Sequence, residues 1–240
     1  MDHETNLFPF VAIMPNPLDN MMWSSLSGTL RHLSVGTDTV RRFAPGFSPL
    51  LGFADLHNPD LSALVPFCEP GEQFYCEGWS GPVPDGWQLI TEATMVRMVW
   101  AGTPDAVAID VGANLVAMNA THVARAMELA QLTKPGPFGP RTIELGDYFA
   151  CFEGDRLMAM AGERMHSGQY REVSGVCTHP DFEGRGLARA LMTKIVRLQL
   201  QRQQIPFLQV MSTNLRARKM YERLGFKDYR EIEVRIITRN

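Results

Sequence analysis

The sequence predicts an α/β fold, and two patterns carry this prediction. Residues 148–153 and 157–165 are β-type segments joined by Gly154-Asp155, which is typical of a β-hairpin. Residues 186–203 form the strongest helical pattern, with one apolar stripe made of Leu187, Leu191, Ile195 and Leu198. Because 45% of the 240 residues are apolar, the chain can bury a substantial core.

The Gly-Thr-Pro-Asp stretch at 102–105 divides the chain into two predicted regions, 1–104 and 105–240. In the first region, 19–33 is the best helix candidate and 86–102 contains a long β-type segment. In the second region we expect alternating elements: a strand at 115–118, a helix capped by Thr121, the hairpin, a strand at 172–178, the helix at 186–203, a strand at 206–211, a helix at 214–224 and a strand at 226–238.

One internal similarity links the two regions. WQLITEATMVRMV and FKDYREIEVRII both begin with an aromatic residue, carry Glu five residues later and then Val-Arg, one residue out of register. The first hundred residues are either a degenerate copy of the second region or share only the pattern of two amphipathic strands.

Composition excludes several classes of function. With 23 Lys and Arg against 26 Asp and Glu, the net charge of -3 offers no footprint for nucleic acid or anionic lipid. No apolar stretch approaches the roughly 20 residues of a spanning helix, and the first residues are acidic where a secretion signal is basic, so we expect a cytoplasmic protein without membrane contact. The four cysteines lack the close pairing of zinc or redox sites, so we expect them reduced and no metal bound.

The turn Gly184-Arg185-Gly186 lies between a predicted strand and the long helix. Glycines let the backbone approach a ligand closely, and the free N–H groups of a first helical turn suit a phosphate. Arg189 stands where the Rossmann fingerprint requires a third glycine, and no P-loop Lys-Ser or Lys-Thr follows. The turn is either a pyrophosphate site or an ordinary strand-to-helix connection.

A second helix carries Asn214 and Tyr221, seven residues apart and therefore two turns apart on one face. Ala217 between them leaves room for a ligand along that face, and Tyr221 could donate a proton. Both residues could also be an ordinary cap and an ordinary core residue.

Together these two motifs resemble the GNAT superfamily, the acetyl-CoA-dependent N-acyltransferases. Its motif is a strand, an R/Q-x-x-G-x-G/A turn and a helix, followed by an N-x-x-A-x-x-x-Y helix. The resemblance covers roughly residues 113–240. Asp181 stands where the family usually has Gln or Arg, so we expect backbone amides to hold the pyrophosphate here.

The resemblance implies a mixed, mostly antiparallel sheet flanked by helices, acetyl-CoA as cosubstrate and an amine as acceptor. The pantetheine arm would run along strand 172–178, from which strand 206–211 would splay away. Tyr221 would be the general acid for the departing thiolate, and Asn214 would contact pantetheine. The residues implied to bind acetyl-CoA are Val176, Cys177, Thr178, Phe182, Glu183, Gly184, Arg185, Gly186, Leu187, Ala188, Asn214, Ala217 and Tyr221.

The acceptor amine must lose a proton before it attacks, which requires a base near the start of strand 172–178. Glu172 is the leading candidate, because many family members carry a catalytic Glu near this place. Glu163 and His166 on the preceding strand are the next candidates. Cys177 is expected to be a packed thiol, since direct transfer needs no covalent intermediate.

Two other functions stay open. AVAIDVGAN resembles the first motif of S-adenosylmethionine methyltransferases, although Asn114 and Val116 stand where its next glycine is expected. A GNAT-fold module could also bind acyl-CoA without catalysis. The acceptor is not readable from the sequence, the loop at 135–140 is a candidate wall of its pocket, and a homodimer is left open.

Overall fold

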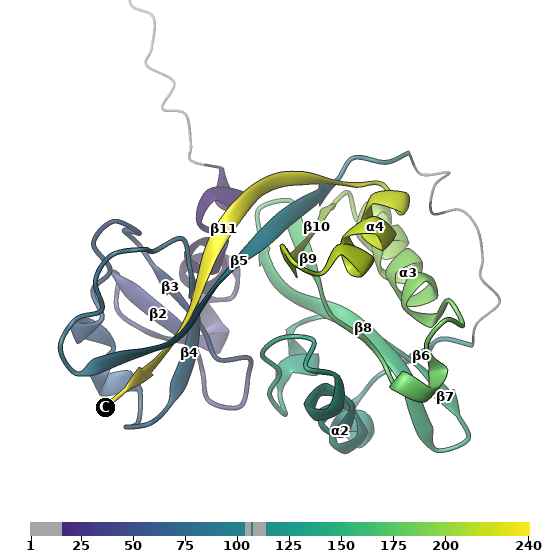
Figure 1. The fold of residues 1–240 in the computed structure, drawn as a ribbon, viewed down its shortest axis with the longest axis horizontal. Helices are drawn as coiled ribbons and strands as arrows, with labels where there is room; N and C mark the ends of the chain where they lie inside the picture. Colours follow the sequence, from purple (N-terminus) through teal and green to yellow (C-terminus); the bar gives the residue numbers. More distant parts are fainter. Residues whose placement is uncertain (1–15, 104–106, 108–113) are drawn as a thin grey trace, which may run out of the picture.

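The computed structural model describes residues 16–103, 107 and 114–240. These residues form a mixed α/β protein built on a curled sheet of 11 strands in the order β1-β2-β3-β4-β11-β5-β10-β9-β8-β7-β6. Figure 1 shows two lobes, with the long strands β5 and β11 running from one lobe to the other. The predicted α/β class and the mostly antiparallel sheet are confirmed.

The strands span Ser34–Gly36 (β1), Val40–Phe43 (β2), Leu50–Phe53 (β3), Gln73–Glu77 (β4), Trp87–Trp100 (β5), Val116–Ala117 (β6), Tyr148–Glu153 (β7), Arg156–Ser167 (β8), Tyr170–Thr178 (β9), Ile205–Met211 (β10) and Phe226–Arg239 (β11). The α-helices span Met21–Ser24 (α1), Val123–Thr133 (α2), Leu187–Gln201 (α3) and Leu215–Arg223 (α4). A 3-10 helix, η4, spans Ser62–Phe67 in the first lobe.

The centre of the sheet is the antiparallel pair of β5 and β11, from Phe226 opposite Trp100 to Arg239 opposite Trp87. On either side the pairing follows the same series. β4 on β11 and β10 on β5 are antiparallel, β3 on β4 and β9 on β10 are parallel, and the next two pairs outward are antiparallel. Residues 234–238 of β11 pair with β4, and residues 95–99 of β5 pair with β10. When these two segments are aligned, Phe226 corresponds to Trp87, and the internal sequence similarity begins at these two residues.

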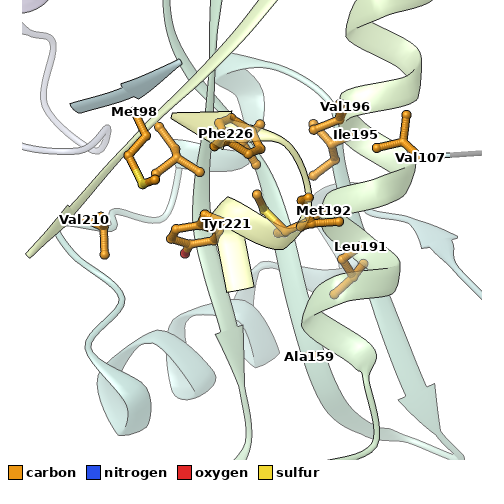
Figure 2. Close-up of a cluster of buried hydrophobic side chains, with 14 of the residues drawn as sticks. Met98, Val107, Ala159, Leu191, Met192, Ile195, Val196, Val210, Tyr221 and Phe226 are labelled. Atoms are coloured by element: carbon orange, nitrogen blue, oxygen red, sulfur yellow. The ribbon is translucent and has the colours of Figure 1, made fainter. Parts of the chain in front are cut away.

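Four buried clusters hold the lobes and their junction in the described residues, one of which packs α2 against β7, β8 and β9. The first packs α3 and α4 against the second lobe's strands and includes Val96 and Met98 of β5 (Figure 2). The second lies at the junction, where Met21 and Leu26 meet Met165 and Phe207. The third fills the first lobe. The 14-residue strand β5 therefore belongs to the cores of both lobes.

The predicted helix at 19–33 is wrong in form. Pro17–Asn20 is a 3-10 turn, α1 has four residues, and Ser25–Thr29 is a π-helical turn in which Gly28 has φ -106° and ψ -112°. The serines here compete for backbone hydrogen bonds, and Ser27 Oγ donates to the Trp23 carbonyl. The cap predicted at Thr121 also lies elsewhere. The capping side chain is that of Asn119, which accepts from the Thr121 N–H.

Both strand-helix-strand units of the second region lie close to their predicted positions. The sheet crosses the predicted division, because β5 lies between β11 and β10. The division itself and most of the AVAIDVGAN segment lie outside the described residues. In the described part of the chain, no helix has the length and apolar character needed to cross a membrane.

Candidate functional site

The glycine turn between β9 and α3 has the conformation that its sequence requires. Gly184 and Gly186 have φ of +78° and +75°, in the left-handed region that side chains disfavour. A Cβ at either position would meet nothing within 4 Å, because the turn faces open space. Gly186 caps α3 without a side-chain hydrogen bond, so the N–H groups of the first turn remain available to an anion.

α4 supplies the second predicted motif. The Asn214 side chain accepts from the Ala217 N–H at 3.1 Å, which makes Asn214 the helix cap. Tyr221 lies two turns later with its ring in the first buried cluster, 6.2 Å from the Phe226 ring in an edge-on arrangement. Figure 2 shows the Tyr221 hydroxyl pointing away from the labelled side chains of this cluster.

A groove runs between these two motifs and encloses about 1390 Å³ of empty space, counting the part open to solvent. It is bounded by β9 on one side, the glycine turn and α3 at one end, and α4 on the other side. Its lining contains Val176, Cys177, Thr178, Phe182, Glu183, Gly184, Gly186, Leu187, Ala188, Asn214, Ala217 and Tyr221. Of the predicted acetyl-CoA residues, the structure brings together all but Arg185. Basic side chains that the sequence reasoning missed also line it: Arg189, Arg216, Lys219 and Arg223.

Two side chains of the turn point elsewhere. The Arg185 guanidinium lies over the Phe182 ring and 3.4 Å from Glu153. Asp181 pairs with Arg156 at 2.8 Å and is absent from the described lining of the groove. Neither Asp181 nor Arg185 is therefore among the described residues that line this end of the groove.

β9 and β10 diverge at the middle of the site. Their parallel pairing ends at Phe207 opposite Glu172, so the following residues of the two strands splay apart. β9 also carries a bulge, because its register with β8 shifts between Met160 and Gly162 and Gly175 has φ +62°. The predicted splay between the two strands is thus present.

A second cavity of about 550 Å³, also partly open, lies in this splay. Its second-lobe walls are Arg164, residues 173–176 of β9, Gln209, Tyr221 and Val234. The other wall comes from residues 135–137 and from four residues that the sequence did not associate with the site, Met22, Leu50, Tyr75 and Met95. The 135–140 loop, interpreted from sequence as a candidate wall, supplies residues 135–137.

Tyr221 and Val176 line both cavities, so the groove and the second cavity meet at the splay. Tyr221 is 8% exposed, and burial raises its pKa to about 12, with a further contribution from Cys177. The phenol therefore stays protonated at neutral pH and can donate a proton.

Glu172 lies at the point where the strands diverge, but its carboxylate is occupied. It is 1% exposed and accepts from Arg164 Nε at 3.0 Å, Arg164 Nη2 at 2.7 Å and the Met165 N–H at 3.1 Å. Arg164 lines the second cavity, and Glu172 is not among its described lining residues. The carboxylate accepts three hydrogen bonds, two of them from Arg164, and the role of Glu172 as base stays a prediction.

The other two candidate bases lie outside both cavities as described. Glu163 is 1% exposed and accepts from Arg171 at 2.8 Å and Gln199 at 2.9 Å. His166 contacts Arg171, and burial followed by the Arg171 charge lowers its pKa to about 4. Both residues are therefore parts of a buried polar network.

The four cysteines lie in the described residues and each has a buried, free thiol. Cys177 lines the groove, and burial raises its pKa to about 11. A thiol with so little thiolate at neutral pH is a weak nucleophile.

A buried network between the lobes supports the second cavity. Glu77 of β4 accepts from Arg97 at 2.6 Å, from Gln209 at 3.1 Å and from the Met22 N–H at 3.2 Å. Arg97 is fully buried and also donates to the Leu18 carbonyl. The network ties β4, β5 and β10 to the start of α1, and no local sequence signal could have revealed it.

Comparison with known proteins agrees with this geometry. The family model described as FR47-like protein matches residues 149–236. A GNAT-family structure from Novosphingobium aromaticivorans DSM 12444 is 30% identical, with a TM-score of 0.82 over 94% of this chain and 99% of that chain. The chain therefore belongs to the GNAT family of acyltransferases.

Two more distant structures share the fold. A GCN5-related N-acetyltransferase-like protein from Streptococcus suis is 15% identical, with a TM-score of 0.61 over 95% of each chain. A GCN5-related N-acetyltransferase from Kribbella flavida is 13% identical, with a TM-score of 0.56 over 91% of this chain and 93% of that chain. The comparison with curated proteins gave no match.

Proposed function

We propose that the protein transfers an acetyl group from acetyl-CoA to a primary amine by direct attack. The observation that carries the proposal is the junction of two cavities at Tyr221 and Val176. The groove is open and more than twice as large as the second cavity, which suits a long cosubstrate. The second cavity is small and suits an acceptor.

In this proposal the glycine turn and the first turn of α3 hold the pyrophosphate. Their free N–H groups and the positive end of the helix dipole favour an anion. The Asp181 side chain is not needed to hold it. β9 pairs with the pantetheine arm where β10 has diverged, since its outward backbone groups have no strand partner beyond Glu172. Asn214 contacts the arm from α4.

The bulge at Gly175 places irregular backbone beside the acyl group. Backbone groups displaced from a ladder can accept or donate hydrogen bonds to a ligand, and we assign them to the thioester carbonyl. The amine nitrogen attacks the carbonyl carbon, the carbon–sulfur bond breaks, and Tyr221 donates its proton to the departing sulfur. The nitrogen, positively charged after the attack, loses one proton to solvent water, and a proton from solvent restores Tyr221.

The acceptor enters as the free amine. Among the described residues that line the second cavity there is no carboxylate and no histidine. Removal from water disfavours the charged ammonium, so the cavity selects the neutral form from solution. Glu172 contributes by holding Arg164 in place.

Two measurements test this function. Acetyl-CoA at about 100 times its dissociation constant should stabilise the fold by about 2.7 kcal/mol, which is a readily detected rise in melting temperature. Free CoA should then appear when a panel of primary amines is added. Binding without CoA release would favour the non-catalytic acyl-CoA module, and stabilisation by S-adenosylmethionine instead would favour the methyltransferase. A cytoplasmic location and a homodimer remain proposals from sequence.

A further inference from the structure

Arg164 is the charged group that the structure presents to the acceptor cavity. It is 8% exposed and lines that cavity, while its partner Glu172 lies behind it. Two of its three nitrogens, Nε and Nη2, donate to the two carboxylate oxygens. The third, Nη1, has no hydrogen-bond partner among the described residues. It is also not among the fully buried side-chain atoms that lack a partner, so it is accessible from solvent.

A guanidinium held in this way presents its remaining N–H groups, two on Nη1 and one on Nη2, in fixed directions. Glu172 is itself anchored by the Met165 N–H at 3.1 Å, so Arg164 cannot turn without breaking a buried ion pair. The cavity therefore contains a preorganised N–H donor whose natural partner is an oxygen of the acceptor.

The charge balance decides which kind of oxygen fits. Glu172 already neutralises Arg164, and Glu77 neutralises Arg97 behind Gln209. A second carboxylate beside Arg164 would be buried close to the Glu172 carboxylate, and like charges in a desolvated site repel each other. A neutral carbonyl accepts from Nη1 without this cost.

Much of the remaining wall is apolar, although Ser174, Gln209 and Tyr75 also line it, and part of it comes from the first lobe. Met22, Leu50 and Met95 face the cavity together with Val173 and Val234, and methionine side chains adapt to bulky groups. No described lining residue carries a free carboxylate that could bind a second ammonium group. The wall therefore suits an aliphatic or aromatic group and disfavours polyamines.

We infer that the acceptor is an α-amino amide with an apolar side chain, whose carbonyl accepts from Arg164 Nη1 while the side chain packs against Met22, Leu50 and Met95. Such a unit occurs in a free amino-acid amide and in the first residue of a peptide. The inference rests on the proposed function, because it assigns the acceptor of that same site.

The test compares acceptors that differ in one group. Phenylalaninamide, phenethylamine, phenylalanine, spermidine and the dipeptide Phe-Ala are each assayed for CoA release. A hydrogen bond from a charged donor corresponds to about a 10- to 100-fold preference, so kcat/KM for phenylalaninamide should exceed that for phenethylamine by this factor. Phenylalanine and spermidine should be poor acceptors. The Phe-Ala arm tells whether the cavity also admits a peptide.

A binding arm separates this inference from the proposed reaction. Phenylalaninamide should raise the melting temperature of the CoA-loaded protein more than phenethylamine does, whether or not transfer occurs. Absence of transfer together with this selective binding would refute the reaction and leave the inference standing. Equal or better binding and turnover of phenethylamine, or of the charged acceptors, would overturn the inference.

Variants identify the residue responsible. The double variant Arg164→Gln with Glu172→Gln replaces the ion pair by two neutral amides and leaves no charge buried alone. Its preference for phenylalaninamide over phenethylamine should fall to within about 3-fold, while acetyl-CoA still raises its melting temperature. Tyr75→Phe is the matched control in the same cavity and should keep the preference. A preference that survives the double variant would assign the carbonyl to another donor.

Discussion

The two lobes repeat one series of strand pairings around β5 and β11, yet the groove forms in the second lobe alone. In the second lobe the parallel pair β9·β10 is joined through the glycine turn and the 15-residue helix α3. In the first lobe the parallel pair β3·β4 is joined through residues 54–72, which contain the 3-10 helix Ser62–Phe67. Residues 78–86 likewise stand where the second lobe has α4.

The pairing of strands therefore does not by itself create the groove. The groove requires a helix whose first turn has free N–H groups, a turn whose backbone only glycine adopts easily, and a second helix opposite it. The described residues of the first lobe include glycines in this conformation, such as Gly71, but its corresponding connections, 54–72 and 78–86, contain no α-helix. The first lobe contributes one wall of the second cavity.

The largest effect on acetyl-CoA binding is expected from a substitution in the glycine turn before α3. Gly186→Val places a β-branched side chain at φ +75°, which costs about 1–2 kcal/mol of folding free energy and directs the side chain into the groove. We expect acetyl-CoA to cause no rise in the melting temperature of this variant.

The first lobe offers a matched control for this change. Gly71 has φ +79° and, like Gly186, open space where a Cβ would lie. Gly71→Val should lower the melting temperature similarly and keep the full response to acetyl-CoA. Loss of the response in both variants would mean that global destabilisation, and not the glycine turn, controls binding.

A second substitution addresses catalysis within the groove. Tyr221→Phe removes the hydroxyl at the junction of the cavities, which matters only as the thiolate develops in the transition state. We expect kcat to fall about 10²-fold while acetyl-CoA still stabilises the protein. A kcat equal to that of the native protein would make Tyr221 a packing residue.

The bulge at Gly175 is a further difference, because the β2·β3 and β3·β4 ladders contain no register shift. A Cβ at Gly175 would lie 3.2 Å from Tyr148 Cε1, and φ is +62°. Gly175→Ala should cost about 1–2 kcal/mol of stability and slow acetyl transfer. Gly154→Ala, at φ +57° with open space, is the control, and equal transfer rates in the two variants would argue against a role for the bulge.

The second lobe could be predicted from sequence because its signals are local. Gly184 and Gly186 before an apolar stripe, and Asn214 with Tyr221 two turns apart, each lie within one or two elements. The structure places Asn214 and Tyr221 across the groove from those glycines. Local signals also located the hairpin, since β7 and β8 match it closely.

The first lobe's part in the site could not be predicted, because it depends on pairing between residues far apart in sequence. Tyr75 reaches the cavity because β4 pairs with β11, whose Ile236 lies opposite it. Glu172 shows a different limit of what the sequence can predict. Its position was predicted well, but its partner Arg164 lies on the neighbouring strand, and only the register of β8 and β9 reveals that its carboxylate is occupied.

The smallest expected effect concerns the junction between the lobes, where β8 packs against the π-helical turn at Ser25–Thr29. His166 lies there, facing Arg171, Glu163 and His32, and burial with the Arg171 charge lowers its pKa from 6.5 to about 4. In that interval the unfolded chain binds a proton that the folded protein does not, so the free energy of unfolding decreases as the pH falls from about 6.5 to about 4. His166→Asn removes this contribution and should give a flatter dependence of the free energy of unfolding on pH, measured by urea unfolding at a series of pH values.

Because carboxylates also titrate below pH 5, the informative quantity is the difference in this pH dependence between the native protein and the variant. Parallel curves for the native protein and the variant would show that His166 binds its proton equally in both states, and the junction would then carry no pH dependence of its own.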